Sequence, residues 1–268
     1  AIIPVPDWLP LPNRRQERAA MQDLDQIIRR IIRERREAGR DEGDLLSMLL
    51  LAQDEDGTAM NDQQLRDEAM TIFLAGHETT ANALNWTWVL LAQNPEVEAR
   101  LHEELDRVLA GRVPSLADLR QLPYTEMVIK ESMRLYPPAW ATTRIALEDF
   151  ELGGYHIPKG SFLMTSMYAV HRDKRYWDEP DAFRPERFSP ENEANIPKYA
   201  YFPFGGGPRV CVGNQFAMME AQLILGTILQ QYSLRLATNQ PITPQPLVTL
   251  RPLYGLPMTL QPRTVPAA

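Results

Sequence analysis

The sequence predicts a single domain that is mainly helical and contains minor β structure. Apolar residues recur at helical spacing through the first half of the chain, most clearly over residues 14–37 and 62–93. After residue 142 this spacing gives way to short alternating runs separated by Gly and Pro, which are typical of short strands. No linker-like or low-complexity stretch divides the 268 residues, so we expect one domain over 1–268.

Start and stop signals divide the first half into elements. Asn61 and Gln64 form a predicted capping box at the start of the longest helix. Pro95 begins the next helix at its first turn, and Pro137-Pro138 end the last one. A short apolar stretch lies at 45–51. From these signals we expect helices over 14–37, 62–93, 95–110, 115–122 and 124–136.

The second half alternates more loosely. Residues 142–152 read as strand, Gly153-Gly154 predict a turn, and residues 155–163 complete a hairpin-like β region. Beyond this region we expect a helix over 162–171, a long loop over 173–201, a helix over 212–229 and proline-interrupted short strands over 232–263.

Composition excludes several classes of protein. The chain is 44% hydrophobic and 24% charged, with a net charge of -7, which argues against nonspecific nucleic-acid binding. No apolar run approaches the roughly 20 residues that span a bilayer. The first 11 residues carry three prolines and lack the basic start of a signal peptide. A single cysteine excludes a disulfide framework and suits a reducing compartment, so we expect a cytoplasmic protein. From the absence of a long apolar run we expect no transmembrane segment.

That cysteine, Cys211, is the residue most indicative of function. It comes directly before the helix expected over 212–229, and the N-terminus of a helix favours an anionic sulfur. A thiolate is a strong axial ligand of haem iron. Taken alone, the residue is more simply interpreted as a buried, inert cysteine. Residues 204–213, Phe-Gly-Gly-Gly-Pro-Arg-Val-Cys-Val-Gly, match the pattern F-x-x-G-x-R-x-C-x-G, which resembles the haem-binding loop of the cytochrome P450 family.

The resemblance implies a cytochrome P450 fold with haem b, iron protoporphyrin IX, as cofactor. It implies that Cys211 ligates the iron, that Arg209 binds a haem propionate and that Phe204 packs on the thiolate side of the ring. Gly207 and Gly213 complete the fixed positions of the loop. The family normally has further helices upstream, and this chain begins Ala-Ile-Ile-Pro-Val-Pro without Met. We therefore expect the C-terminal portion of the family's length, truncated at the N-terminus.

A second motif lies inside the longest predicted helix, where residues 75–80 read Ala-Gly-His-Glu-Thr-Thr. From local helix chemistry alone, a blind interpretation, Glu78 would face solvent beside a threonine hydroxyl that donates to a carbonyl one turn earlier. However, Gly76 and the threonines weaken regular helix there, within apolar surroundings. The segment resembles the family's oxygen-binding motif A-G-x-[DE]-T-[TS]. The resemblance implies that Glu78 and Thr79 relay protons to dioxygen.

A pair of opposite charges lies in the helix expected over 124–136. Glu131 and Arg134 lie one turn apart among apolar residues, and a charged pair in such a setting needs additional partners. With Arg187 they resemble the family's structural Glu-Arg-Arg triad.

By resemblance Arg144 binds the second propionate, although an ordinary edge-strand arginine is the alternative. We expect His171 to face the core or the long loop instead of binding iron.

Substrate contacts are predicted by family resemblance at mostly apolar or aromatic positions, which indicates a lipophilic substrate such as a fatty acid or a terpenoid. These same positions could be plain core. The candidates are Ile72, Phe73, Ala75, Ala139, Trp140, Thr142, Leu253 and Tyr254.

The resemblance as a whole implies a monooxygenase that inserts one atom of O₂ into such a substrate. Its electrons would come from a separate ferredoxin- or flavin-type partner, since one cysteine cannot hold an iron–sulfur cluster. A peroxide-driven relative is a nearby alternative, which the Glu78–Thr79 pair disfavours. The other alternative is a fragment with weak or no haem binding and no catalysis, completed by another chain or by dimerisation.

Overall fold

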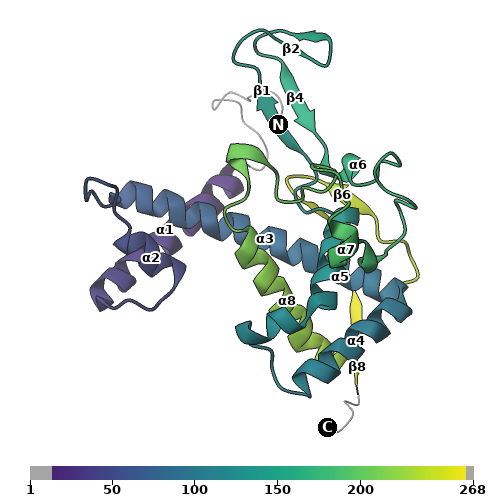
Figure 1. The fold of residues 1–268 in the computed structure, drawn as a ribbon. Helices are drawn as coiled ribbons and strands as arrows, with labels where there is room; N and C mark the ends of the chain where they lie inside the picture. Colours follow the sequence, from purple (N-terminus) through teal and green to yellow (C-terminus); the bar gives the residue numbers. More distant parts are fainter. Residues whose placement is uncertain (1–13, 264–268) are drawn as a thin grey trace. The chain divides into compact units, whose positions relative to one another are not determined.

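The computed structural model describes residues 14–263 and is mainly helical with short strands (Figure 1), which confirms the predicted fold class. Internal contacts divide the chain into two compact units, Ala1–Ala75 and Gly76–Ala268, here called the N-terminal and C-terminal units. Helix α3 (Asp62–Gln93) begins in the first unit and continues into the second. Its bounds are those predicted from the Asn61 cap and from Pro95.

The N-terminal unit is built from α1 (Arg14–Ala38), α2 (Leu45–Leu51) and the first turns of α3. The apolar stripe of α1 places Ile28 and Ile32 in a small core with Leu65 and Met70 of α3. The short apolar stretch at 45–51 is α2, and the carboxylate of Asp44 caps it by accepting a 2.9 Å hydrogen bond from the Ser47 N–H.

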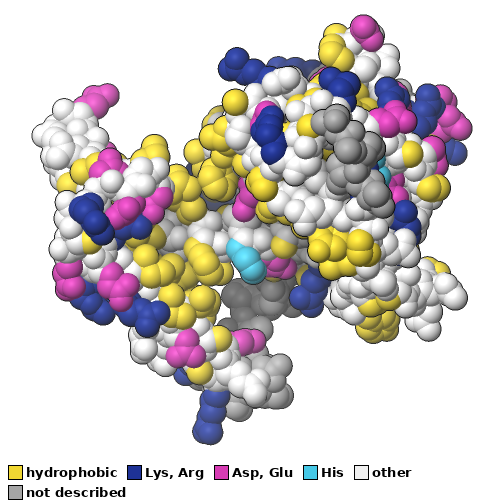
Figure 2. Space-filling model, turned by 90° about the horizontal axis from the view of Figure 1, so that it is seen from below, with side chains coloured by type: hydrophobic (Ala, Val, Ile, Leu, Met, Phe, Trp, Pro, Cys, Tyr) yellow, Lys and Arg dark blue, Asp and Glu magenta, His cyan; other side chains and the backbone are white. Residues whose placement is uncertain are grey.

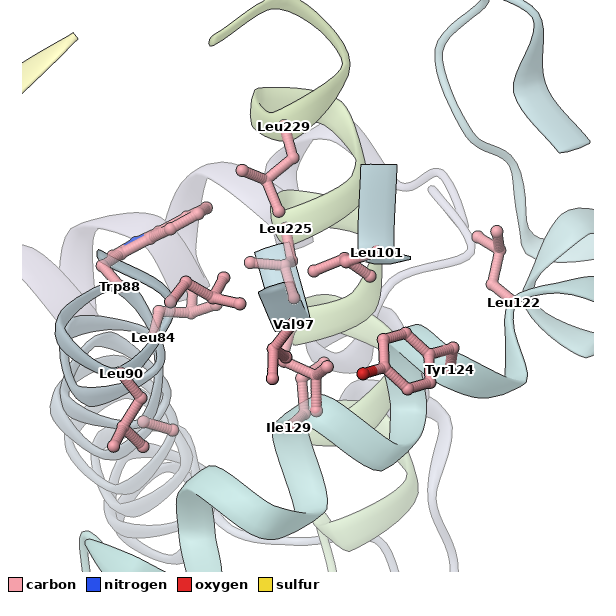
Figure 3. Packing of buried hydrophobic residues seen from close by; sticks show 14 of the residues in the cluster. Leu84, Trp88, Leu90, Val97, Leu101, Leu122, Tyr124, Ile129, Leu225 and Leu229 are labelled. Atoms are coloured by element: carbon pink, nitrogen blue, oxygen red, sulfur yellow. The ribbon is translucent and has the colours of Figure 1, made fainter. Parts of the chain in front are cut away.

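Four long helices form the core of the C-terminal unit: the rest of α3, α4 (Pro95–Leu109), α5 (Pro123–Leu135) and α8 (Asn214–Gln231). A short helix, η1 (Leu116–Gln121), joins α4 to α5. In Figure 3, Leu84 and Trp88 of α3, Ile129 of α5, and Leu225 and Leu229 of α8 converge on one another. Each fully buried leucine of this kind stabilises the fold by roughly 1.5–3 kcal/mol.

Among the described residues, the strands form four antiparallel pairs, beside two isolated β-bridges. Gly153 and Gly154 turn the chain between two of these strands, as predicted. Strand β1 lies beside β4 with Thr143 opposite Met164, and β5 lies beside β8 with Tyr232 opposite Pro262. The strands are β1 (Thr142–Ile145), β2 (Phe150–Leu152), β3 (Tyr155–Ile157), β4 (Phe162–Thr165), β5 (Tyr232–Leu236), β6 (Pro244–Pro246), β7 (Leu250–Pro252) and β8 (Met258–Pro262).

The helix predicted over residues 162–171 is wrong. Its first half is strand β4, because those residues pair with β1. Only the single turn α6 (Met167–Val170) is helical, and it begins where the Ser166 hydroxyl accepts a 3.2 Å hydrogen bond from the Ala169 N–H. Pairing with a strand twenty residues earlier outweighs the local apolar spacing.

Two other boundaries also differ from expectation. Helix α8 begins at Asn214, two residues later than predicted, because the Gly213 carbonyl is the first to accept an intrahelical hydrogen bond, from Ala217 (2.9 Å). The long loop predicted over 173–201 contains two single turns, η2 (Pro185–Phe188) and α7 (Pro190–Glu193), each started by a proline.

Basic and acidic side chains are interspersed on the face shown in Figure 2. Among the described residues, none of the helices combines the length and the apolar character needed to cross a bilayer.

Candidate active site

The loop that carries Cys211 is closed on itself by backbone hydrogen bonds. The Cys211 N–H donates to the Phe204 carbonyl (2.9 Å), and the Val210 N–H donates to the Gly207 carbonyl (3.1 Å) across the short helix η3 (Gly207–Arg209). The Cys211 side chain is exposed, so the alternative of a cysteine packed into the core does not hold. Phe204 is half-buried and packs against the main core, which anchors the start of the loop.

Two structural reasons account for the three consecutive glycines. Gly205 (φ +75°) and Gly207 (φ +67°) adopt left-handed backbone conformations that side chains disfavour. At Gly206 a Cβ atom would lie only 2.8 Å from Cε1 of the Tyr199 ring. The glycines therefore let the loop turn tightly and approach Tyr199 closely.

A cavity of about 560 Å³ lies beside this loop. Arg144 of β1 and Arg209 of the loop both line it, so the two arginines predicted to bind propionates face one space. Arg144 Nη1 also donates to Thr142 Oγ1 (3.0 Å) and to the Thr143 carbonyl (2.7 Å). Cys211 is not among the lining residues, so the cavity fits the carboxylate end of a ligand and not its whole ring.

Two more cations that the sequence did not single out also line this cavity. Arg175 forms an ion pair with Asp173 (2.5 Å), and the Lys198 ammonium lies 5.1 Å from the centre of the Tyr199 ring. Neither belongs to a recognisable motif, because both come from the irregular loop that only the folded chain brings to β1.

Glu131, Arg134 and Arg187, the three residues of the expected triad, lie in contact through the Glu131 carboxylate. The Glu131 carboxylate is fully buried and accepts hydrogen bonds from Arg134 Nε (2.6 Å) and Nη2 (2.9 Å). It also accepts from Arg187 Nε (3.2 Å) and from the Arg184 N–H (2.9 Å). Two guanidiniums and one backbone donor therefore surround one carboxylate, as a buried charge requires.

Arg134 in turn binds the backbone of the long loop. Its Nη1 donates to the carbonyls of His171 (2.8 Å) and Pro180 (2.7 Å), and its Nη2 donates to the Ala182 carbonyl (3.0 Å). The planar five-donor guanidinium makes this possible, since a lysine has only three donors on one nitrogen. The triad thereby fixes α5 to the segment that leads to the cysteine loop.

His171 is fully buried next to this network. Its Nε2 accepts a 2.9 Å hydrogen bond from the Phe202 N–H, two residues before Phe204. Burial, with the nearby Arg134 charge, lowers the pKa of His171 to about 3, so the ring is neutral at physiological pH. This histidine supports the start of the cysteine loop, in line with the prediction that it faces the core or the long loop.

The acid–alcohol motif lies on α3, where Glu78 and Thr79 are both half-buried. Glu78 Oε1 accepts a 2.6 Å hydrogen bond from the hydroxyl of Thr249, and Thr249 Oγ1 accepts a 3.1 Å hydrogen bond from Asn82 Nδ2. Glu78 is thus not the solvent-facing acid of the blind interpretation. Sequence reasoning missed Thr249 and Asn82, since Thr249 lies 171 residues from its partner and belongs to no motif.

The predicted substrate contacts are spread over several elements. Trp140 and Thr142 are half-buried before and in β1, and Trp140 Nε1 donates to the Leu247 carbonyl (2.9 Å). Leu253 is half-buried and Tyr254 is exposed in the turn that follows β7. A shared pocket stays a prediction for these residues and for the remaining candidates, which are Ile72, Phe73, Ala75 and Ala139.

The donor set fits haem b. An exposed cysteine sulfur lies at the end of a glycine-rich loop, and a Cβ at Gly213 would lie 4.0 Å from that sulfur, in ordinary van der Waals contact. Two guanidiniums that face one cavity suit a pair of carboxylates. Cys211 would hold the iron, and Arg144 and Arg209 would hold the propionates.

The family model for Cytochrome P450 matches residues 1–258 of the chain. The chain belongs to the cytochrome P450 family. Proteins of this family are haem-thiolate proteins that carry haem b. The family is therefore the one that the cysteine loop predicted, and its cofactor is the group that fits the donor set.

Several curated P450 relatives come from Streptomyces. Cyclooctatin synthase of Streptomyces melanosporofaciens is 44% identical over 93% of this chain and 55% of the relative. Cyclooctat-9-en-7-ol 5-monooxygenase of the same organism is 41% identical over 95% of the chain and 56% of the relative. Pentalenene oxygenase of Streptomyces avermitilis is 36% identical over 96% of the chain and 57% of the relative. The chain thus spans about half the length of these relatives.

Proposed function

We propose that this chain provides the iron ligand, the propionate-binding arginines and the proton-relay pair of a haem-thiolate monooxygenase, and that both compact units belong to one such domain. The observation that carries the proposal is the exposed Cys211 at the end of a loop whose glycines and Arg209 match the family pattern. The single cysteine suits a reducing compartment such as the cytoplasm.

Bound haem b supplies the activation of O₂. Overall, a substrate C–H bond and O₂ become C–OH and water, with the uptake of two protons and of two electrons from a separate ferredoxin- or flavin-type donor. Cys211 would hold the iron through its thiolate, a ligand type that tunes haem toward oxygen activation. The guanidiniums of Arg144 and Arg209 would bind the propionates and orient the ring.

Helix α3 carries the two residues that deliver the protons. The Glu78 carboxyl passes a proton toward the Thr79 hydroxyl and is then reprotonated from solvent, so that neither residue is changed by a turnover. Both side chains are half-buried, and this limits the access of water that would let protons and reduced oxygen escape unproductively. The intact pair supports the use of O₂ in preference to peroxide.

We propose a lipophilic substrate. The predicted contact positions are mostly apolar or aromatic, and two relatives are named for pentalenene and for cyclooctat-9-en-7-ol. These two compounds are therefore the first substrates to test.

The experiment supplies the haem-loaded protein with an electron source and isotopically labelled O₂, in parallel with a ferredoxin and its reductase or with a flavin-type reductase. The expected result is a hydroxylated product from at least one of the two compounds, with one labelled oxygen atom per product molecule. Thr79→Ala should lower product yield and raise hydrogen peroxide release. Haem-loaded protein that takes up electrons from neither donor type and forms no product from either compound would instead support a fragment without catalysis.

A further inference from the structure

The Glu78 carboxylate is connected to a short, directional chain of hydrogen bonds. The Thr249 hydroxyl has one proton, which it donates to Glu78 Oε1 at 2.6 Å. Its oxygen is turned to accept from Asn82 Nδ2 at 3.1 Å. Thr249 and Asn82 are each only 5% exposed, so water does not compete freely for these bonds. The direction of the Thr249 hydroxyl is therefore fixed by its two partners.

The backbone at Thr249 is held independently of Glu78. The carbonyl of the next residue, Leu250, accepts a hydrogen bond from Trp86 Nε1 (2.9 Å), and the Leu250 N–H donates to the Pro138 carbonyl (2.9 Å). Trp86 is fully buried and stacks on Tyr136 with ring centres 4.1 Å apart. These contacts place Thr249 whether or not Glu78 is present, so Thr249 positions the carboxylate and not the reverse.

Asn82 lies four residues after Glu78, which places both on one face of α3. Asparagine is a poor residue for a helix interior because its amide competes for backbone hydrogen bonds. Here the amide is used instead to hold Thr249 from the side of the helix that carries the acid. Two residues of α3, Glu78 and Asn82, therefore bind the same Thr249 hydroxyl in the segment before β7.

Building on the proposed function, we propose that Thr249, oriented by Asn82, is a positioning residue for proton delivery. It ties Oε1 of Glu78 and fixes the rotamer of the acid, so that the exchanged proton is held at Oε2. Nothing is oxidised or reduced in this step, since one proton leaves Glu78 and one returns from water. A misplacement of a catalytic group by about 1 Å can cost on the order of 100-fold in rate.

The test compares Thr249→Val, which removes the donor at nearly constant volume, with Thr249→Ser, which keeps it. The matched control is Thr87→Val, because Thr87 of α3 is a buried threonine like Thr249, but its hydroxyl donates to the Ala83 carbonyl (2.8 Å) and not to Glu78. In haem-loaded protein with a substrate that the wild type oxidises, Thr249→Val should lower product formed per electron pair about tenfold and raise peroxide release. Thr249→Ser and Thr87→Val should stay within about twofold of wild type. Asn82→Ala should lower the product yield in the same way as Thr249→Val. This variant replaces Thr249→Val in the test if the Thr249→Val protein does not fold.

A second readout does not depend on turnover. The infrared carboxyl band that disappears in Glu78→Gln identifies Glu78, and its frequency should shift in Thr249→Val but not in Thr249→Ser or Thr87→Val. Unchanged product yield together with an unshifted band in a folded Thr249→Val protein would overturn the positioning role. A wild type that binds haem yet oxidises no substrate would remove the proposed function, while the infrared comparison would still decide whether Thr249 controls the acid.

Discussion

Replacing Glu131 by Gln should destabilise the C-terminal unit severely. The carboxylate is fully buried and accepts four hydrogen bonds, two from Arg134, one from Arg187 and one from the Arg184 N–H. Glutamine keeps the shape but removes the charge, which leaves the fully buried Arg134 guanidinium without its counterion. Breaking a buried pair in this way costs about 3–5 kcal/mol. Since domains are stable by only about 5–15 kcal/mol, much of the protein should then be unfolded at moderate urea concentrations.

The measurement is equilibrium urea unfolding followed by tryptophan fluorescence. Trp177 is a local reporter, because its ring centre lies 5.0 Å from the Arg134 guanidinium carbon. The control is Glu103→Gln, which makes the same chemical change at an exposed position of α4 and should alter the midpoint little. A loss below about 1 kcal/mol in Glu131→Gln would refute the reasoning, since surface ion pairs have that value.

Three other perturbations test the loop and its surroundings. Arg144→Gln and Arg209→Gln should each weaken haem retention by about 10- to 100-fold, as the loss of a charged hydrogen bond of about 1.5–3 kcal/mol predicts, measured by haem transfer to a scavenging apoprotein. Gly206→Ala should lower the thermal midpoint, because its methyl group would lie 2.8 Å from the Tyr199 ring, and calorimetry would detect the change. The pKa of His171 is lowered to about 3 in the folded chain, so the unfolded chain binds the extra proton between pH 6.5 and 3. The contribution of neutral His171 to the free energy of unfolding should therefore be fully present above pH 6.5. Below pH 6.5 the free energy of unfolding should fall by up to about 1.4 kcal/mol per pH unit, a slope that His171→Gln should reduce.

Each of these expectations has a contradicting result. Equal haem transfer rates in wild type and both glutamine variants would show that the cavity arginines do not bind propionates. A Gly206→Ala protein with an unchanged midpoint would mean that the contact with Tyr199 is not close in solution. Identical acid slopes with and without His171 would show that its burial does not shift its pKa.

Local sequence signals predicted the helices well because their causes are local. The Asn61 cap and Pro95 mark the ends of α3, and the structure has the same bounds. Residues 162–165 were predicted as helix and form a strand, since their partner β1 lies twenty residues away and periodicity carries no information about pairing.

The candidate site shows the same division. Glu131 and Arg134 are neighbours on one helix, so their apolar surroundings alone indicated a buried pair. Arg187 entered only through family resemblance, because nothing local links it to α5. Thr249 could not be predicted at all, since it meets Glu78 only when the segment before β7 folds onto α3.

The central claim is that the Cys211 thiolate ligates haem iron, and the absorption spectrum of the reduced, haem-loaded protein under carbon monoxide tests it most directly. We predict the strongly red-shifted Soret band of thiolate-ligated haem in the wild type, and its loss in Cys211→Ser. A wild-type band at the position typical of histidine-ligated haem, or the same red-shifted band in Cys211→Ser, would contradict the claim.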